Sequence, residues 1–359
     1  MIYGEMEVMD LKKIREEIDL LDSKILNLLN GRMELALMAK KLKHQIEDTQ
    51  REKEVLEKIR SNSRGLINAE FIERVYLEVI EESKALQHKD YPLIAFQGEH
   101  GAYGELAAMA WNKAFVPVPC PVLPDIFEGV KSGLYDCGIV PVENTLGAWV
   151  AQANRLLINT DLFVVGAVEL AVNHCLLALP EMDHREIRSV YSHSQTLSQC
   201  RQFLTRNKLE PVPFYDSAGA AKMLAETKPK SGAAIASELA AEVYGLEIMK
   251  ENMGDIDRNL TRYLVLSKTE NKAAGNKCSL VFSTEHKAGT LFKVLDVFAR
   301  EGINLTRIES IPARPGDYVF ILDFVGSVEE GHVVQALTEV GQITRTFRVL
   351  GCYTEKKVP

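Results

Sequence analysis

Two basic residues stand on the apolar face of the first predicted helix, which is an unusual place for charge. Apolar residues recur at spacings of three and four from Ile14 to Leu42, and this pattern predicts a seam that packs against partner helices. Arg32 fills the one gap in the seam, and Lys43 lies eleven residues later, within about 20° of the same face. A charged residue on such a seam needs a compensating group. The pair therefore predicts a site for a small dianion inside a helical bundle.

The pattern alone leaves two other interpretations of these charges open. Arg32 could extend to the edge of the bundle or pair with an acidic neighbour such as Glu34. The lysines Lys40, Lys41 and Lys43 could form a solvated turn. Neither alternative requires a ligand.

The elements that must position these residues change type along the chain. Between Asp10 and His88 there is no proline and helix formers dominate, which predicts an all-α segment. From Tyr91 onward, short β-rich apolar runs alternate with helical patterns and glycine turns, as is typical of an α/β fold with a mostly parallel sheet. After a polar link, the order strand, helix, strand, strand, helix, strand indicates a ferredoxin-like α+β fold. We therefore expect a multidomain chain with an all-α bundle over residues 10–89, an α/β domain over 91–268 and an α+β domain over 277–354.

Composition argues against several classes of partner. The chain has 359 residues, enough for two or three domains, and its formal charge of −8 disfavours nucleic acid and membrane surfaces. The start MIYGEMEVMD lacks the pattern of a secretory signal, and no apolar run approaches the roughly 20 residues that span a bilayer, so we expect a cytoplasmic protein. The cysteines form no C-x-x-C pair and are expected to be buried thiols, and the histidine spacings indicate no metal.

Further polar residues follow on the next two predicted helices. Asp48, Arg51 and Glu52 open the second helix. Ser83 and Gln87 stand four residues apart on one face of the third. With these residues, nearly the whole helical segment resembles the all-helical chorismate mutase family. The resemblance places that family's substrate contacts on Arg15, Arg32, Lys43, Asp48, Arg51, Glu52, Ser83 and Gln87.

This resemblance implies the Claisen rearrangement of chorismate to prephenate. That reaction needs no nucleophile and no proton transfer, only a clamp for two carboxylates and donors for the charge that develops on the ether oxygen. The three arginines of the set suit the carboxylates because a guanidinium binds a carboxylate with two parallel hydrogen bonds. The family's pattern assigns Lys43 and Gln87 to the ether oxygen and Glu52 to the substrate hydroxyl.

The same family exchanges its first helix between two chains. The resemblance therefore implies a homodimer or a higher homo-oligomer in which Arg15 serves the site of the other chain. One departure concerns the connection from Lys43 to Asp48, which is shorter than in the family's pattern and could misplace Lys43.

Polar loops follow several predicted strands of the α/β segment, where ligands usually bind in such folds. The first loop, GEHGAYGE, lacks both glycine patterns of nucleotide sites, so no nucleotide is expected. The order of the loops resembles prephenate dehydratase from Leu93 to Ser267, and its Thr-Arg-Phe motif is present as Thr261, Arg262 and Tyr263. The other site motifs fall on Glu143, Asn144, Thr145, Ser192, His193, Gln195 and Asn259. Taken singly, such Ser and Thr residues often only cap helices.

The dehydratase resemblance implies that prephenate loses carbon dioxide and its ring hydroxyl to give phenylpyruvate, without a metal or an organic cofactor. By the family pattern, Thr261 donates to the departing hydroxyl and Arg262 anchors a carboxylate. It also implies two α/β lobes that resemble periplasmic binding proteins, the second over about residues 172–249. Trp149 near the cleft could shift the preference to the related acid arogenate. The departures from the family's common residues are Ala102, Gly104, Trp149, Ser194 and Tyr263.

The last segment resembles an ACT regulatory domain from Cys278 to Tyr353. This implies an amino-acid effector at a dimer interface, and in dehydratases that effector is phenylalanine. The matching positions are Ala288, Gly289, Thr290, Leu291, Asn304, Leu305, Glu309 and Ser310. The family's Glu-Ser-Arg-Pro motif carries Ile311 in place of arginine, for which Arg314 could substitute. A domain kept only for dimerisation remains an alternative.

Together the three resemblances predict a bifunctional enzyme of phenylalanine biosynthesis, with chorismate and prephenate as substrates and L-phenylalanine as feedback effector. Two alternatives remain. One is arogenate dehydratase activity, and the other is a non-catalytic amino-acid-binding sensor that retains the cleft only for recognition.

Overall fold

A computed structural model of the chain describes residues 11–43, 45–62, 65–145, 151–256, 258–271, 275–314 and 317–358. It divides into two compact units, residues 1–91 (unit 1) and residues 92–359 (unit 2). Trp149 and the side chain of Arg314 lie outside what the structure describes. Among the described helices, none is long and apolar enough to cross a membrane.

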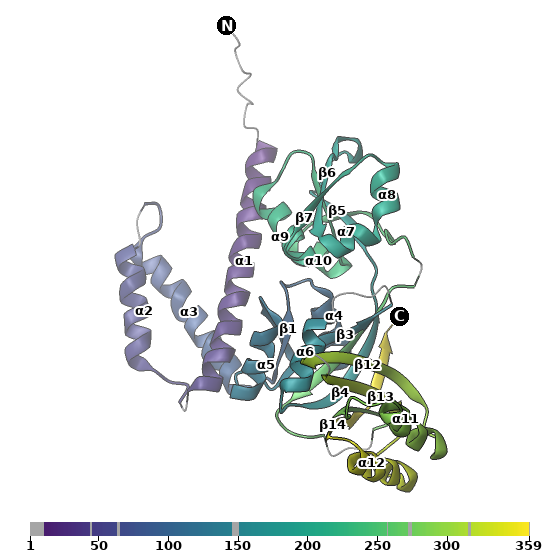
Figure 1. Cartoon of the computed structure of the whole chain (residues 1–359). Helices are drawn as coiled ribbons and strands as arrows, with labels where there is room; N and C mark the ends of the chain where they lie inside the picture. The colour runs from purple at the N-terminus through teal and green to yellow at the C-terminus, as the bar shows by residue number, and fades with distance from the viewer. Residues whose placement is uncertain are drawn as a thin grey trace. The chain divides into compact units, whose positions relative to one another are not determined.

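The described part of unit 1 is helical, as the sequence predicted. It contains α1 (Leu11–Leu42), α2 (Thr49–Asn62) and α3 (Ala69–His88) (Figure 1). Helix α3 begins where the side chain of Asn68 accepts a hydrogen bond from the amide of Phe71 at 2.7 Å, a typical N-cap. It packs against both other helices.

The predicted seam of α1 is largely exposed in a single chain. At its C-terminal end Leu35 and Leu42 are 64% and 74% exposed, whereas Leu37, which is not a seam residue, is buried together with Ile80 of α3. Toward the N-terminus the same stripe is open, and Ile18 and Leu28 are 50% and 75% exposed. An apolar stripe of this length on a helix needs a partner surface.

The first sheet of unit 2 has the strand order β15-β4-β10-β3-β1-β2. Its strands are β1 (Leu93–Gln97), β2 (Val116–Cys120), β3 (Cys137–Asn144), β4 (Phe163–Ala171), β10 (Leu260–Ser267) and β15 (Glu355–Val358). Strand β1 is parallel to β2 and β3, but β10 runs antiparallel to β3 and β4. Of the described strands of this sheet, five therefore run in one direction, and the expectation of a mostly parallel sheet is confirmed. Strand β10 is the exception, because it enters the sheet in the opposite direction after the chain leaves the second lobe. Helices of this lobe are α4 (Tyr103–Trp111), α5 (Leu123–Ser132) and α6 (Ala151–Asn159).

The second lobe contains a five-stranded sheet in the order β7-β6-β8-β5-β9. Its strands are β5 (Cys175–Ala178), β6 (Ser189–His193), β7 (Glu210–Phe214), β8 (Gly232–Ala236) and β9 (Glu247–Lys250). Its helices are η1 (His184–Glu186), α7 (Ser194–Gln199), α8 (Arg201–Arg206), α9 (Ser217–Thr227) and α10 (Glu238–Tyr244). Both lobes thus have the predicted α/β architecture.

The last part of the chain has the predicted βαββαβ order. Its elements are β11 (Lys277–Ser283), α11 (Thr290–Arg300), β12 (Leu305–Arg314), β13 (Asp317–Val325), α12 (Gly331–Ile343) and β14 (Thr346–Tyr353). The four strands form the sheet β12-β13-β11-β14, whose core includes Phe282, Phe298 and Phe324. We call this part the ferredoxin-like domain. After β14 the chain adds β15 in parallel to β4, a strand that no sequence pattern had predicted.

Strand β14 also lies against β4, so the ferredoxin-like domain and the first lobe are in direct backbone contact. A Cβ atom on Gly351 would lie 2.1 Å from the carbonyl oxygen of Val164. Only glycine allows this approach.

We predict that Gly351→Ala lowers the stability of unit 2 by about 1–3 kcal/mol, the usual result of forcing an atom into a packed contact. The matched control is Gly331→Ala, where the added Cβ would meet no atom within 4 Å. Urea unfolding followed by circular dichroism measures both. Equal midpoints for the two variants would show that the contact is not rigid.

Candidate active sites

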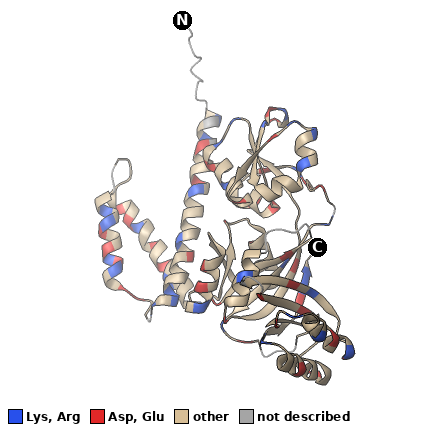
Figure 2. Ribbon diagram, in the orientation of Figure 1, with Lys and Arg blue, Asp and Glu red and all other residues tan. Residues whose placement is uncertain are grey.

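Arg32 and the C-terminal half of α3 form one polar site in unit 1. The Arg32 guanidinium donates to the hydroxyl of Ser83 and, at 3.2 Å, to the carbonyl oxygen of Val79. Ser83 in turn donates to the Val79 carbonyl at 2.7 Å. Both acceptors of Arg32 are neutral oxygens, so its charge is available for an anion. Figure 2 shows acidic and basic residues interspersed along α1 and α2.

Gln87 lies one turn beyond Ser83 on α3 and is buried. Its amide oxygen has no hydrogen-bond partner among the described residues. Leaving such an atom unsatisfied costs about 1–3 kcal/mol, so a further hydrogen-bond donor is expected at this position. Lys84, beside Ser83, lies 3.4 Å from Glu52 and joins α2 to this region.

Four of the predicted mutase residues form no hydrogen bond or ion pair with Arg32, Ser83 or Gln87 among the described residues. Arg15 and Arg51 are exposed, and Arg51 lies 3.5 Å from Glu54. Asp48 accepts from the amide of Arg51 at 2.9 Å and so caps α2. Lys43 is exposed and lies one residue beyond the end of α1.

The expectation that Lys43 shares an inward helical face with Arg32 is therefore wrong in a single chain. The amide of Lys43 bonds the carbonyl of Lys40, three residues back, and this tighter turn closes the helix. The chain must turn there because only four residues separate Lys43 from Asp48. The alternative was a solvated turn formed by Lys40, Lys41 and Lys43. Of these three lysines, Lys40 forms an ion pair with Asp90.

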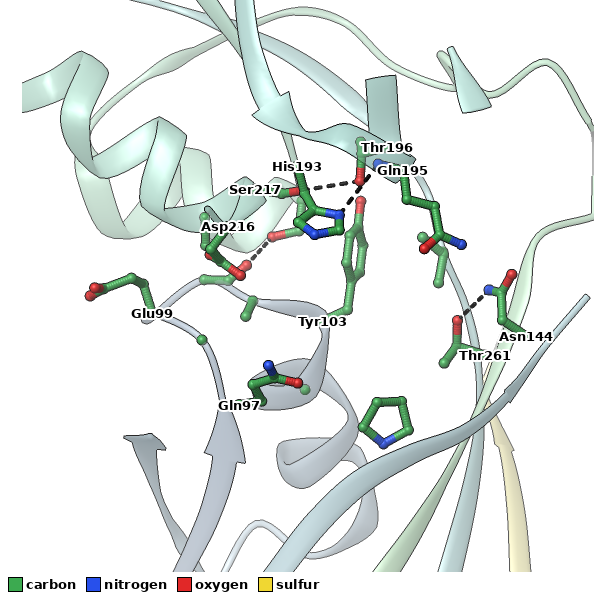
Figure 3. Close-up of a pocket in the computed structure, with 18 of the residues that line it drawn as sticks. Gln97, Glu99, Tyr103, Asn144, His193, Gln195, Thr196, Asp216, Ser217 and Thr261 are labelled. Atoms are coloured by element: carbon green, nitrogen blue, oxygen red, sulfur yellow. Dashed lines mark hydrogen bonds between the residues drawn. The ribbon is translucent and has the colours of Figure 1, made fainter. Parts of the chain in front are cut away.

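A cavity of about 520 Å³ lies between the two lobes of unit 2 (Figure 3). The loop that follows β1, strands β3 and β10, the end of β6 with helix α7, and the start of α9 all contribute to it. The predicted dehydratase residues that line it are Asn144, His193, Gln195, Asn259, Thr261 and Tyr263. The cavity is large enough for a small organic acid.

Thr261 and Asn144 face each other across the β3–β10 ladder and are hydrogen-bonded at 2.8 Å. The same amide nitrogen of Asn144 lies 2.9 Å from Asn259 Oδ1 and 3.4 Å from the carbonyl of Leu260. A carbonyl can only accept, so the Asn144 amide group must be the donor on this side. Thr261 therefore accepts from Asn144, and its own hydroxyl hydrogen is free to point into the cavity.

This hydrogen-bond network continues from Asn259 to three further residues that line the cavity, Gln199, His174 and Tyr103. Asn259 donates to Gln199 Oε1 at 3.2 Å, and His174 Nε2 lies 2.7 Å from the same oxygen. On its other side, His174 Nδ1 lies 2.8 Å from the hydroxyl of Tyr103. Gln199 Oε1 can only accept, so His174 Nε2 is the donor to it, and burial lowers the pKa of His174.

Arg262 and Glu143 do not line the cavity, and the expectation that Arg262 anchors a substrate carboxylate is wrong in this structure. Side chains alternate along a strand, so Thr261 and Tyr263 face the cavity while Arg262 faces the other side of β10. Its guanidinium lies 4.0 Å from Glu143 and pairs with Asp323 and Glu355. Glu143, next to Asn144 on β3, is turned away for the same reason.

Two more predicted residues support the cavity from outside it. Ser192 is buried and donates to the carbonyl of Ile235 at 2.6 Å, and its oxygen lies 3.0 Å from Ser217. Thr145 closes the β3–β10 corner, since its hydroxyl donates to the carbonyl of Arg258 and accepts from the amide of Leu260. Neither residue lines the cavity, and neither is a helix cap, which was the alternative for such residues.

The cavity-lining residues that were not among the predicted site residues include Tyr103, His174, Gln199 and Asp216. Gln199 stands four residues after Gln195 on α7, a spacing that could have indicated it. Asp216 caps α9 by accepting from the amide of Gly219 at 2.8 Å. Burial raises the pKa of Asp216, although this capping bond and His193 oppose the shift.

A second cavity, of about 300 Å³, lies in the ferredoxin-like domain where β11 leads into α11. Gly289, Thr290 and Leu291 of the predicted effector motif line it, with Phe292 and the aromatic rings of β13. Gly289 has φ +84°, a left-handed conformation that favours glycine, and forms the N-cap of α11.

The other predicted effector residues lie elsewhere in this chain. Ala288, Asn304, Leu305, Glu309 and Ser310 do not line this cavity. Glu309 instead accepts from Asn154 of α6 at 2.6 Å and from Arg307 at 2.7 Å. Ile311, in the arginine position of the family motif, is buried.

Comparison with known families divides the chain in the same order. The family profile for chorismate mutase type II matches residues 14–88, that for prephenate dehydratase residues 94–271 and that for the ACT domain residues 279–342. The bifunctional chorismate mutase/prephenate dehydratase of Escherichia coli K12 is 33% identical over 374 aligned positions, which cover 97% of each chain. A chloroplast arogenate dehydratase/prephenate dehydratase of Arabidopsis thaliana is 39% identical over 274 positions, 72% of each chain.

Two solved structures resemble unit 2. A prephenate dehydratase of Arthrobacter aurescens in complex with L-Phe has a TM-score of 0.68 and 28% identity, covering 73% of this chain and 89% of that one. GqqA, described as a novel type of quorum-quenching acylase, also has a TM-score of 0.68, with 32% identity over 73% of this chain and 97% of its own.

The helical bundle, the two-lobed cavity and the ferredoxin-like domain define an enzyme of aromatic amino acid biosynthesis with two catalytic parts and an ACT domain. The chain belongs to the bifunctional chorismate mutase/prephenate dehydratase family. It is an isomerase in its helical part and a carbon–oxygen lyase in its α/β part.

We predict that Asn144→Asp lowers kcat for prephenate by at least about tenfold, because a carboxylate only accepts and would draw the Thr261 hydrogen away from the substrate. KM should change little, since the shape of the cavity is kept. The control is Asn112→Asp, where the side-chain oxygen already accepts from the amide of Ala114. Steady-state kinetics at saturating prephenate measure the effect, and an unchanged kcat would contradict the assigned direction of the bond.

Proposed function

We propose that the cavity between the lobes converts prephenate to phenylpyruvate with Thr261 as the donor to the departing hydroxyl. The observation that carries this assignment is the bond from Asn144 to Thr261, which leaves the Thr261 hydroxyl hydrogen for the substrate. The electron pair of the breaking bond to the carboxyl carbon enters the ring, carbon dioxide leaves, and the ring C–O bond breaks. The departing oxygen takes a proton and leaves as water, and Thr261 regains its proton from solvent.

A neutral hydroxyl suffices as donor because aromatisation drives the step. With Arg262 turned away, another group must hold the substrate carboxylate. The start of α4 supplies one: its N-cap Ala102 makes no side-chain capping bond, and Tyr103 and Gly104 of its first turn line the cavity. Free amides at a helix N-terminus bind anions. Ala102 and Gly104 stand where the family commonly has other residues, and neither has a side chain that could cap this end of the helix.

We propose that Arg32, Ser83 and Gln87 form part of the chorismate site, completed by a second chain. Arg32 would bind one carboxylate and Gln87 would face the ether oxygen. The exposed stripe at Ile18 and Leu28 supports a homodimer in which α1 of one chain covers this site in the other and brings Arg15 to it. Sedimentation tests the dimer, and a monomer with full mutase activity would contradict it.

Chorismate fed to the purified enzyme should appear as phenylpyruvate. Thr261→Val should stop at prephenate, and Lys43→Ala should slow prephenate formation by at least about a hundredfold, the usual loss of one transition-state donor. Lys24→Ala, an exposed lysine of the same helix, is the control for Lys43. If Lys43→Ala is as fast as Lys24→Ala, Lys43 is only surface charge. If Thr261→Val still forms phenylpyruvate, Thr261 is not the donor.

The same assay separates the alternatives. A binding-only sensor would convert neither substrate at any concentration of the wild-type chain. Arogenate remains a candidate substrate because the Arabidopsis relative carries that activity in its name. Comparing kcat/KM for purified arogenate and prephenate decides which acid the cavity prefers.

We propose that L-phenylalanine binds the cavity beside Gly289 and inhibits the dehydratase. Phe292, Tyr318 and Phe320 offer aromatic surface for its ring, and the N-terminus of α11 suits its carboxylate. Calorimetry should show saturable binding of L-phenylalanine but not of L-alanine, together with a lower dehydratase rate. No heat and an unchanged rate would defeat the proposal and favour a domain used only for dimerisation.

A further inference from the structure

Two buried arginines join the ferredoxin-like domain to the strands that carry Asn144 and Thr261. Arg262 lies on β10 directly after Thr261, and Arg307 lies on β12 of the ferredoxin-like domain. Their side chains are 5% and 6% exposed. Neither lines the catalytic cavity.

Arg262 is held by groups that follow it by sixty or more residues in the chain. It pairs with Asp323 of β13 and Glu355 of β15, and donates to the hydroxyl of Tyr353 of β14 at 2.8 Å. Asp323 is fully buried. A carboxylate at such a position requires a cation, so β13 and the far face of β10 are held together.

Arg307 reaches the neighbouring strand, β3, at an irregular point. In the β3–β10 ladder Arg262 is opposite Glu143 and Tyr263 is opposite Pro141, so Val142 is left without a partner on β10. Its carbonyl oxygen instead accepts from Arg307 at 3.1 Å and from Asn154 at 3.4 Å.

This bulge lies two residues before Asn144. Bulges near active sites re-aim the side chains that follow them. Arg307 also lies 3.6 Å from Asp323, so one buried carboxylate serves both arginines. The bulge on β3 and the far face of β10 are thus held by a single group of side chains.

We propose that Arg307 and Asp323 of the ferredoxin-like domain are positioning residues of the dehydratase, which fix the bulge at Val142 and the face of β10 and thereby align Asn144 with Thr261. The inference rests on the proposed role of Thr261. It makes the ferredoxin-like domain part of the active-site scaffold in addition to its proposed role in effector binding. Glu309 of the predicted effector motif accepts a hydrogen bond from Arg307 at 2.7 Å. A movement of the Glu309 side chain would therefore act on the Val142 bulge through Arg307.

Arg307→Leu tests the proposal in the full-length enzyme. It should lower kcat for prephenate by about tenfold to a hundredfold, the loss expected when reacting groups move by about an ångström, with KM nearly unchanged. Arg307→Lys, which keeps one donor for the Val142 carbonyl, should recover part of kcat. Chorismate mutase activity of the same samples should not change.

The matched control is Arg348→Leu. Arg348 also crosses from the ferredoxin-like domain to the first lobe, but it donates to the carbonyls of Thr160 and, at 3.0 Å, Leu157 at the end of α6. This variant should lose similar stability and keep kcat. If Arg348→Leu loses as much kcat as Arg307→Leu, or if Arg307→Leu keeps kcat within about twofold of wild type, the contact is structural only and the proposal fails.

Deuterium exchange gives a readout that does not depend on the reaction. Amides of residues 137–145 and 260–267 should exchange faster in Arg307→Leu than in Arg348→Leu, and equal exchange would overturn the proposal. If the wild-type enzyme does not turn over prephenate but Arg307→Leu still exchanges faster than Arg348→Leu, the proposed function is refuted and the structural role of Arg307 is retained. Asp323→Asn, which keeps the shape of the side chain, gives the same comparisons if Arg307→Leu does not fold.

Discussion

The antiparallel pairing of β10 with β3 is the contact on which the dehydratase site depends. It places Thr261 opposite Asn144, although more than a hundred residues and the whole second lobe separate them in the chain. Because side chains alternate along each strand, this one register decides which groups face the cavity and which face away. A shift of β10 by one residue would turn Arg262 into the cavity and remove Thr261 from it.

The opposite face of the same two strands carries charge that water does not reach. Arg262 and Arg307 both lie within ion-pair distance of Asp323 there, and Arg307 also donates to the carbonyl at the Val142 bulge. This arrangement is constrained, because moving Arg262 would remove the hydrogen-bonded cation of the buried Asp323 carboxylate. The rigidity of the catalytic register therefore comes from the ferredoxin-like domain and from β15, which belongs to the catalytic sheet although it follows that domain in the chain.

Unit 1 has polar and apolar groups that lack a partner in a single chain. Arg32 binds neutral oxygens, and the Gln87 amide oxygen has no hydrogen-bond partner among the described residues. The apolar stripe of α1 is exposed. Both features have the same physical meaning, since apolar surface and buried polar groups each require a partner. Helix α1 ends just before Lys43 because the link to Asp48 is short, so the placement of this lysine depends on what covers α1.

The sequence by itself determined the order and type of the domains, because helical and strand periodicities and the ordered motifs are local properties of the chain. It also identified Asn144, Asn259 and Thr261, whose motifs stand at the ends of strands. Only the tertiary structure decided that Arg262 serves the domain junction, that His174, Gln199 and Tyr103 support the site, and that β15 joins the first sheet. The physical reason is that strand direction, register and long-range ion pairs are set by contacts between distant segments, and no local pattern records them.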